Sequence, residues 1–214
     1  MEFRAKIVKW TEIEKWCEEI NMKMSVSFQP DVIIGMSRGG LVPARIVADM
    51  NLIKDLFAVK TEHWGLTATV DGEAVMKYGL NVSVEGRNVL VVDDITDTGQ
   101  SMKLAYDYAM TLKAKSVKTA TMLHIAHSKF IPDFYGEEVS EDKWTWFIFP
   151  WNIYEDLTNL IGKLKISDAG QSRINELLIS SYDLSVEDSL LKKVIDQMVR
   201  LGKLKETNGT FSVT

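Results

Sequence analysis

Cysteine and long apolar runs are nearly absent from this chain of 214 residues. Cys17 is the single cysteine, so no disulfide can form within the chain, which suits a reducing cytosol. No apolar run approaches the roughly 20 residues that a membrane span requires. Residues 1–10 mix charged and apolar side chains and carry no apolar signal-peptide core. We therefore expect a cytoplasmic protein without membrane association.

An excess of positive charge is also lacking. The chain has 25 lysines and arginines against 30 aspartates and glutamates, a formal net charge of −5. This balance argues against a nucleic-acid-binding surface over most of the molecule. Any anionic ligand must then be held by local groups, and we expect a metal ion to assist them. The 46% of hydrophobic residues are enough to form a packed core.

Strand-like and helix-like segments alternate over the first two thirds of the sequence. Short apolar runs bounded by glycine or charged residues predict strands, and apolar residues at spacings of three and four predict helices. The expected elements are a helix at 11–23, a strand at 31–35, a helix at 41–51, strands at 55–59 and 88–92, a helix at 100–112 and a strand at 117–124. This order predicts an α/β fold whose parallel sheet is covered by helices.

Two other stretches differ from this pattern in their composition and periodicity. Residues 61–88 are polar and contain several glycines, and we expect a mobile excursion, such as a hairpin, rather than core. After Trp151 the sequence has no convincing strand, and its last helical segment with the polar tail hints at a winged-helix wing. Three helical segments are expected there, at about 155–164, 169–181 and 186–202. We therefore predict a core domain at 1–152 and a helical appendage at 153–214.

The segment 89–101 carries the functional argument. A buried strand leads into the adjacent carboxylates of Asp93 and Asp94, and a short loop rich in hydroxyl groups and glycine then opens a helix. Ligands bind at the carboxyl ends of strands in parallel α/β sheets. Backbone N–H groups at a helix N-terminus, with the Thr98 and Ser101 hydroxyls, form a cradle for a phosphomonoester. The two carboxylates can accept hydrogen bonds from vicinal sugar hydroxyls, so the segment predicts a site for ribose 5-phosphate.

This segment resembles the motif of the type I phosphoribosyltransferases that binds phosphoribosyl pyrophosphate (PRPP). The resemblance implies the type I phosphoribosyltransferase fold, here with a C-terminal helical bundle. It implies that Asp93 and Asp94 hold the ribose and, through ribose and pyrophosphate, a Mg²⁺ ion. It makes Asp97, which matches the family's carboxylate near purine N7, the candidate for proton transfer. The residues expected around the 5′-phosphate are Thr96, Asp97, Thr98, Gly99, Gln100 and Ser101.

Residues 35–40 resemble the pyrophosphate loop of the same family. Their backbone amides and the Arg38 guanidinium would face a diphosphate, and the paired glycines permit unusual backbone geometry. The residues expected to bind pyrophosphate are Ser37, Arg38, Gly39, Gly40 and Lys60. Residues 61–88 stand in the place of the family's flexible catalytic loop, which closes over PRPP and excludes water.

Residues 144–151 resemble the base-binding segment of xanthine–guanine and hypoxanthine–guanine phosphoribosyltransferases. The resemblance implies that Trp146 stacks on the purine and that the backbone of Phe147 reads its edge. Those enzymes have a lysine that donates to O6, and the aligned position here is Ile125, which has no donor. An unpaired O6 would cost about 1–3 kcal/mol, so adenine is favoured. Lys129 could restore the donor by a different loop path, which leaves 6-oxopurines as the alternative.

Metal ligands beyond this pattern are few. The 6-oxopurine enzymes usually have an acid near a second metal at the position of Asn152. Glu155 or Asp156 could substitute for it, or the second site is absent. His124 and His127 lie three residues apart, but no third ligand is spaced convincingly near them. No zinc site is predicted.

The resemblance implies an enzyme of purine salvage that makes a nucleoside monophosphate and pyrophosphate from PRPP and a purine base. AMP from adenine is the favoured product, as in an archaeal-type adenine phosphoribosyltransferase with a helical extension. Family members are commonly dimers, so a homodimer is expected. A regulator that responds to PRPP without catalysis is a rival class. Residues 151–214 hold eight Lys/Arg and nine Asp/Glu and no basic recognition face, which speaks against it.

Overall fold

The computed structural model describes residues 3–63 and 74–214. The chain divides into two compact units, residues 11–143 on the one hand and residues 1–10 with 144–214 on the other. This division differs from the predicted boundary after residue 152, because β1 (Ala5–Ile7) pairs in parallel with β8 (Trp146–Ile148). The pairing joins the N-terminal residues and the segment around β8 to the C-terminal helices.

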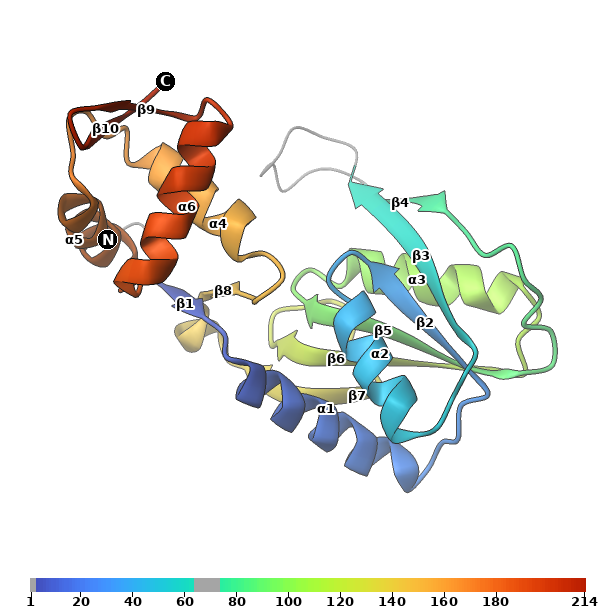
Figure 1. Ribbon diagram of the computed structural model, residues 1–214. Coiled ribbons are helices and arrows are strands. Elements are labelled where there is room, and N and C mark those ends of the chain that lie inside the picture. Colours follow the sequence, from blue (N-terminus) through green and yellow to red (C-terminus); the bar gives the residue numbers. More distant parts are fainter. Residues whose placement is uncertain (1–2, 64–73) are drawn as a thin grey trace. The chain divides into compact units, whose positions relative to one another are not determined.

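A mixed sheet forms the centre of the unit at residues 11–143 (Figure 1). In the described part of the chain its strand order is β4-β3-β2-β5-β6-β7, with every neighbouring pair parallel except β3 and β4. The strands are β2 (Val32–Ser37), β3 (Leu56–His63), β4 (Ala74–Tyr78), β5 (Asn88–Thr96), β6 (Ser116–Ile125) and β7 (Phe134–Val139). The predicted parallel α/β architecture is confirmed.

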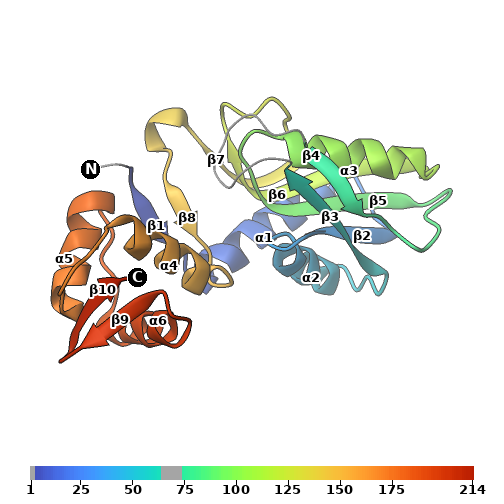
Figure 2. The same ribbon diagram turned by 90° about the horizontal axis from the view of Figure 1, so that it is seen from above.

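Helices cover both faces of this sheet (Figure 2). They are α1 (Trp10–Ser25), α2 (Leu41–Met50) and α3 (Gln100–Thr111), with α3 on one face and α1 and α2 on the other. The buried residues of α3, Met102, Ala105 and Ala109, share an apolar cluster with Val89 and Val91 of β5. Because β2 and β5 lie between these layers, residues 32–36 and 89–92 are buried without alternation, as in central parallel strands.

The first helix buries the side chains that its periodicity predicts. Ile13, Trp16, Cys17, Ile20 and Met24 lie on its buried face. Burial raises the pKa of the Cys17 thiol to about 12, with a smaller contribution from Glu18. Cys17 therefore remains a neutral core thiol at physiological pH.

The strand β5 is longer than predicted. It continues past residue 92 through the acidic pair to Thr96, because its parallel pairing with β6 includes Asp93 with Thr121 and Thr96 with His124. The two carboxylates therefore belong to the end of a strand rather than to a turn that follows it. This places their side chains on a backbone that is fixed by the sheet.

The polar stretch at 61–88 contains the end of β3 and all of β4, which pair antiparallel. This pairing agrees with the hairpin that was one interpretation of the segment. The expected mobile loop falls on residues 64–73, which lie outside the described residues.

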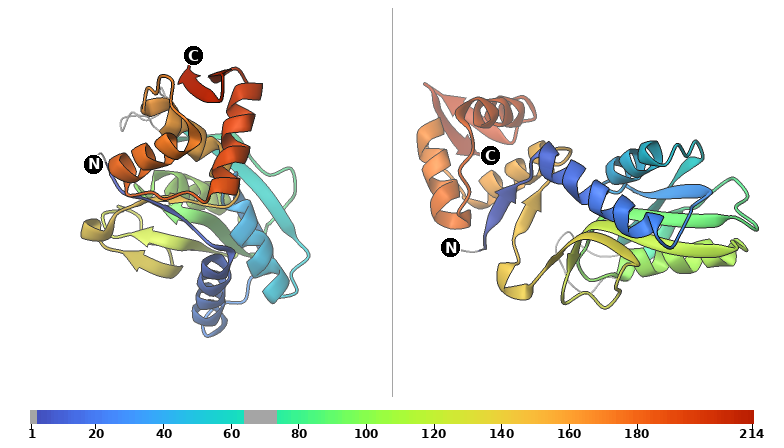
Figure 3. Two further views of the ribbon diagram at one scale, coloured as in Figure 1. Left: turned by 60° about the vertical axis from the view of Figure 1, so that its left-hand side comes forward. Right: turned by 90° about the horizontal axis from the view of Figure 1, so that it is seen from below.

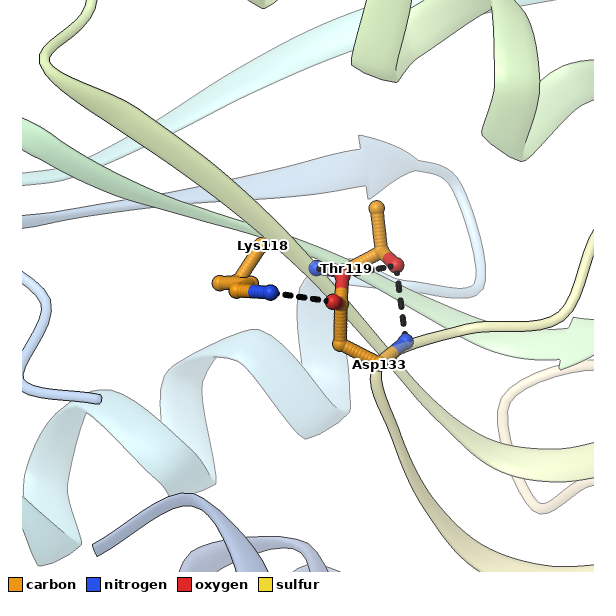
Figure 4. A network of polar contacts seen from close by, with 3 residues as sticks. All are labelled: Lys118, Thr119 and Asp133. Atoms are coloured by element: carbon orange, nitrogen blue, oxygen red, sulfur yellow. Dashed lines mark hydrogen bonds and ion pairs between the residues drawn. The ribbon is translucent and has the colours of Figure 1, made fainter. Parts of the chain in front are cut away.

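A polar network fixes the start of β7, a strand that the sequence did not indicate (Figure 4). Asp133 accepts hydrogen bonds from the Thr119 main-chain N–H and hydroxyl, both at 2.9 Å, and forms an ion pair with Lys118 at 2.7 Å. The Asp133 N–H donates in turn to the Thr119 hydroxyl at 3.1 Å. These contacts anchor the far end of the loop that connects β6 with β7.

The second unit contains three helices and a hairpin in its described part (Figure 3). They are α4 (Ile153–Lys163), α5 (Gln171–Tyr182), α6 (Asp188–Arg200), β9 (Leu204–Thr207) and β10 (Thr210–Val213). The three predicted helices are confirmed, but the expectation of no strand is wrong, because β9 and β10 pair antiparallel and Ala169 bridges to Phe211. A hairpin after the last helix agrees with the hint of a wing. None of the described helices is long and apolar enough to cross a membrane.

Candidate functional site

Most of the residues predicted to bind PRPP lie at the carboxyl ends of neighbouring parallel strands. Ser37 ends β2 and pairs with Lys60 of β3, while Asp93 and Asp94 stand near the end of β5. In a parallel α/β sheet this edge is where ligands bind. The structure thus brings the predicted pyrophosphate, ribose and phosphate groups together on one unit.

The loop after β2 lies directly on the acidic end of β5. A side chain at Gly39 would overlap the Asp94 carboxylate, and one at Gly40 would come within 2.5 Å of the Val92 carbonyl oxygen. At Gly40 the obstructing atoms are main chain, so only a residue without a Cβ fits, whereas a Cβ at Gly39 would force the Asp94 side chain to move. The Gly40 main chain also donates a hydrogen bond to Asp93. Two motifs that are far apart in the sequence therefore form a single surface.

The remaining predicted pyrophosphate ligands frame this loop. The peptide bond between Ser37 and Arg38 is cis, and Arg38 is exposed. Lys60 is partly buried beside Ser37 through the β2–β3 pairing. Arg38 thus lies on the loop that contacts the acidic pair, and Lys60 lies one strand further away, on β3; that the two bind pyrophosphate stays a prediction.

Asp93 and Asp94 form an electrostatically costly pair. The pKa of Asp93 is raised well above its ordinary value, first by burial and second by the negative charge of Asp94. Main-chain hydrogen bonds offset part of this cost, since the Asp94 N–H donates to Asp93 Oδ1 at 3.0 Å and the Ile95 N–H to Asp94 Oδ1 at 2.9 Å. Hydroxyl donors or a cation beside the pair would stabilise its ionised form.

The loop that the sequence predicts to bind phosphate follows this pair. Gly99 has a φ of 80° in the left-handed region and lies just before α3. The first turn of α3 has no acidic residue, so the positive end of the helix dipole there favours an anion. The Thr98 hydroxyl accepts a hydrogen bond from the Gln100 N–H at 3.4 Å. The loop thus combines main chain, a hydroxyl group and a helix N-terminus, and that it binds the 5′-phosphate stays a prediction.

Thr96 differs from the other residues expected around the phosphate. Its side chain is only 2% exposed, and its hydroxyl has no hydrogen-bond partner in the described part of the chain. Its neighbour across the sheet, His124, is also buried with Nδ1 unpartnered among the described residues. The Thr96 hydroxyl therefore belongs to the interior beneath the cradle and not to its surface.

Asp97 makes a contact that the sequence did not reveal. Its Oδ1 lies 2.8 Å from His127 Nε2, and the side chains are 51% and 40% exposed. The two residues are 30 positions apart, and only the fold brings the loop after β6 to the loop after β5. In the sequence, His127 stands out only by its spacing of three residues from His124, which is a metal-binding pattern and does not point to Asp97.

The predicted base-binding residues are divided between the two units. Ile125 ends β6 and is fully buried. Its side chain has no polar atom, so it offers neither a donor nor an acceptor. Trp146 lies in β8 with a 44% exposed side chain, and its ring centroid is 6.3 Å from that of Phe3. Phe147 beside it is partly buried. That Trp146 and Phe147 bind the base stays a prediction.

Within residues 3–63 and 74–214 there is no group of three His, Cys, Asp or Glu side chains that could hold a metal ion. Asn152 precedes α4 and does not cap it with its side chain, while Asp156 in the first turn is buried. A metal at the acidic pair would therefore need oxygen ligands from a bound substrate. Two carboxylates whose charges repel each other suit a Mg²⁺ ion held in that way.

Comparisons with known proteins agree with this geometry. The family described as "Phosphoribosyl transferase domain" matches residues 9–156. A xanthine-guanine phosphoribosyltransferase of Idiomarina loihiensis is 30% identical over 151 residues, which cover 71% of this chain and 89% of that protein. A hypoxanthine-guanine phosphoribosyltransferase of Aquifex aeolicus is 27% identical over 158 residues, 69% of this chain and 87% of that protein. The crystal structure of a purine phosphoribosyltransferase from Pyrococcus horikoshii has the same fold, with a TM-score of 0.59 at 24% identity over 71% of this chain and 94% of that one.

The carboxylate pair generates a prediction about stability. An acid whose pKa is raised by folding makes the folded state less stable as pH rises from the ordinary value of 3.8 through the raised pKa. An asparagine in place of Asp93 would keep the acceptor oxygen but remove this charge. We expect Asp93→Asn to melt at a higher temperature than the native chain at pH 7.5 without Mg²⁺ or PRPP, by about 2–4 °C for each 1 kcal/mol of relieved repulsion.

Thermal melting followed by circular dichroism at pH 7.5 and at pH 4 measures this difference, which should shrink at the lower pH. Asp97→Asn is the matched control, since it removes an exposed carboxylate and should change the melting temperature little. A lower melting temperature for Asp93→Asn than for the native chain at pH 7.5 would contradict the account.

Proposed function

Because the chain belongs to the phosphoribosyl transferase domain family, we propose that it is a purine phosphoribosyltransferase. The reaction joins N9 of a purine base to the anomeric carbon of PRPP and releases pyrophosphate. The observation that carries the proposal is the contact of Gly39 and Gly40 with Asp93 and Asp94, beside the cradle at Gly99. That one surface offers groups for a diphosphate, a sugar diol and a phosphate ester, which are the three parts of PRPP.

The residues of this surface divide the substrate between them. The N-terminus of α3 and the Thr98 hydroxyl hold the 5′-phosphate, and Asp93 and Asp94 accept hydrogen bonds from the ribose hydroxyls. Arg38 and Lys60 lie where the pyrophosphate leaves. A bound Mg²⁺ supplies positive charge to the leaving pyrophosphate. The chain itself contributes positioning and electrostatic stabilisation, without a covalent intermediate.

Asp97 is the proposed acid–base group. Its carboxylate is half exposed at the start of the cradle, between the phosphate loop and the loop after β6. From there it can accept the proton that the purine ring releases from N7 as N9 forms its new bond.

The base class is where the relatives and the sequence differ. The sequence favoured adenine because Ile125 replaces a donor, whereas the named relatives act on xanthine, hypoxanthine and guanine. The relatives support a 6-oxopurine as the first candidate, and we propose it as such. Adenine is the second candidate, favoured by the fully buried and apolar Ile125.

A regulator without catalysis receives less support. The hairpin after α6 resembles a wing. On the exposed face of α6, however, the positive charge of Lys192 is paired with the negative charge of Asp196 at 2.9 Å. A surface that grips nucleic acid needs net positive charge.

The proposed enzymatic activity can be tested directly. With PRPP and Mg²⁺, initial rates of pyrophosphate release measured with adenine, hypoxanthine, guanine and xanthine should show turnover with at least one base. A preference for hypoxanthine, guanine or xanthine supports the first candidate, and a preference for adenine supports the second. No turnover with any of the four, alongside salt-dependent DNA binding, would favour the regulator and overturn the proposal.

The role of Asp97 is tested by substitution. Asp97→Asn keeps the size of the side chain but cannot take a proton, so kcat should fall by about 100-fold or more. Asp93→Asn is the comparison, since it replaces a charged acceptor of the ribose hydroxyls by a weaker neutral one and should mainly raise KM for PRPP. Steady-state kinetics of both variants separate the two roles. An unchanged kcat for Asp97→Asn would show that proton transfer takes place elsewhere.

A further inference from the structure

The edge strand β4 lies beside one of the residues predicted to bind pyrophosphate. In the described part of the chain β4 pairs only with β3, and Tyr78 at its end stands opposite Lys60. An edge strand has a partner strand on one side alone. Its position therefore depends in part on contacts outside the sheet, and the segment that follows β4 makes one.

Tyr108 of α3 holds the chain where β4 ends. The Leu80 N–H donates a hydrogen bond to the Tyr108 hydroxyl at 2.8 Å. A Cβ at Gly79 would overlap that same hydroxyl, so the main chain rests directly on the tyrosine. Leu80 and the tyrosine ring also pack against the apolar cluster that contains Val89 and Val91. The end of β4 is therefore tied to α3 by both polar and apolar contacts.

The pairing of β3 with β4 is irregular next to Lys60. Lys60 pairs with Tyr78, but Thr61 pairs with Met76, so Lys77 is the extra residue of a β-bulge. A bulge bends its strand and increases the local twist, and bulges beside functional sites re-aim a side chain. The anchored residues come directly after this bulge, so they fix where along β3 it falls.

The side chain of Lys60 points away from the face that α3 covers. Phe57 and Val59 of β3 pack in the apolar cluster with Met102 of α3. Because side chains alternate along a strand, Lys60 faces the opposite side of the sheet, which α2 covers. Lys60 pairs with Ser37 at the end of β2, where the loop predicted to bind pyrophosphate begins.

Resting on the proposed function, in which Lys60 contacts the pyrophosphate of PRPP, we propose that Tyr108 is a positioning residue for Lys60. Its hydroxyl anchors the end of β4, this anchor fixes the bulge, and the bulge directs the lysine towards the leaving group. The helix α3 begins after Gly99, at the loop predicted to bind the 5′-phosphate, and carries Tyr108 in its last turn. One helix thus ties the two ends of the PRPP site together.

The first test is Tyr108→Phe, which removes the hydroxyl and keeps the ring. We expect KM for PRPP to rise by about threefold to tenfold, the size of one lost hydrogen bond. The value of kcat should stay nearly unchanged, because a group that holds pyrophosphate in both the ground state and the transition state contributes uniform binding. Initial rates with the base that the native chain uses best measure both constants.

The reverse reaction separates positioning of Lys60 from a general loss of structure. There a nucleoside monophosphate and pyrophosphate form PRPP and the free base. In Tyr108→Phe the KM for pyrophosphate should rise by a factor similar to that for PRPP, whereas the KM for the monophosphate should not change. Gly79→Ala disturbs the same contact from the other side and should reproduce this pattern. Tyr106→Phe is the matched control from the same helix and should behave like the native chain.

A double substitution tests whether Tyr108 acts through Lys60. Lys60→Met should raise KM for PRPP by itself. Adding Tyr108→Phe to Lys60→Met should then raise it no further, because two residues that act through one contact are not additive. Circular dichroism shows whether each variant is folded, and Gly79→Ala takes the place of Tyr108→Phe if the latter is not.

Three results would overturn the inference. They are a KM for PRPP that neither Tyr108→Phe nor Gly79→Ala changes, an equal rise of KM for pyrophosphate and for the monophosphate, and an effect of Tyr108→Phe that persists undiminished beside Lys60→Met. An unchanged KM for PRPP in Lys60→Met would remove the assignment of Lys60 to pyrophosphate, and with it this inference. A native chain that turns over no base contradicts the proposed function itself.

Discussion

The close approach of two main-chain segments is the constraint on which the site depends. The loop after β2 rests on the acidic end of β5 because Gly39 and Gly40 have no side chains there. The approach fixes the distance between the groups that would hold a diphosphate and those that would hold a ribose. It also lets the Gly40 main chain donate to Asp93, so the contact contributes to both geometry and electrostatics.

In the unliganded chain this arrangement makes the ionisation of Asp93 beside Asp94 unfavourable. Burial and the charge of Asp94 oppose ionisation of Asp93, and a few main-chain hydrogen bonds offset only part of that cost. Substrate hydroxyl groups and a cation would offset more of it. Functional sites commonly hold such strained arrangements, and the surrounding sheet keeps them in place. Here β5, paired on both sides, provides that support.

The sequence predicted those parts of the fold that periodicity and local motifs encode. The buried faces of α1 and α6 and the core of β5 follow from the spacing of apolar residues. The cradle before α3 was predicted from its residue types alone. These features are local, so a single stretch of sequence contains what determines them.

Features that depend on residues far apart in the chain were not predicted from the sequence. The short strand β1 becomes a strand only through β8, and β7 only through β6 and the Asp133 network. The contact of Asp97 with His127 depends on two loops that the sheet brings together.

PRPP binding to the Gly39→Ala variant tests the central claim most directly. Titration calorimetry with Mg²⁺ should show saturable binding of PRPP to the native chain and at least about tenfold weaker binding to Gly39→Ala, with circular dichroism confirming that the variant is folded. Gly162→Ala, where an added Cβ meets no atom within 4 Å, should bind like the native chain. A native chain that ignores PRPP, or a Gly39→Ala variant that binds it equally well, would contradict the account.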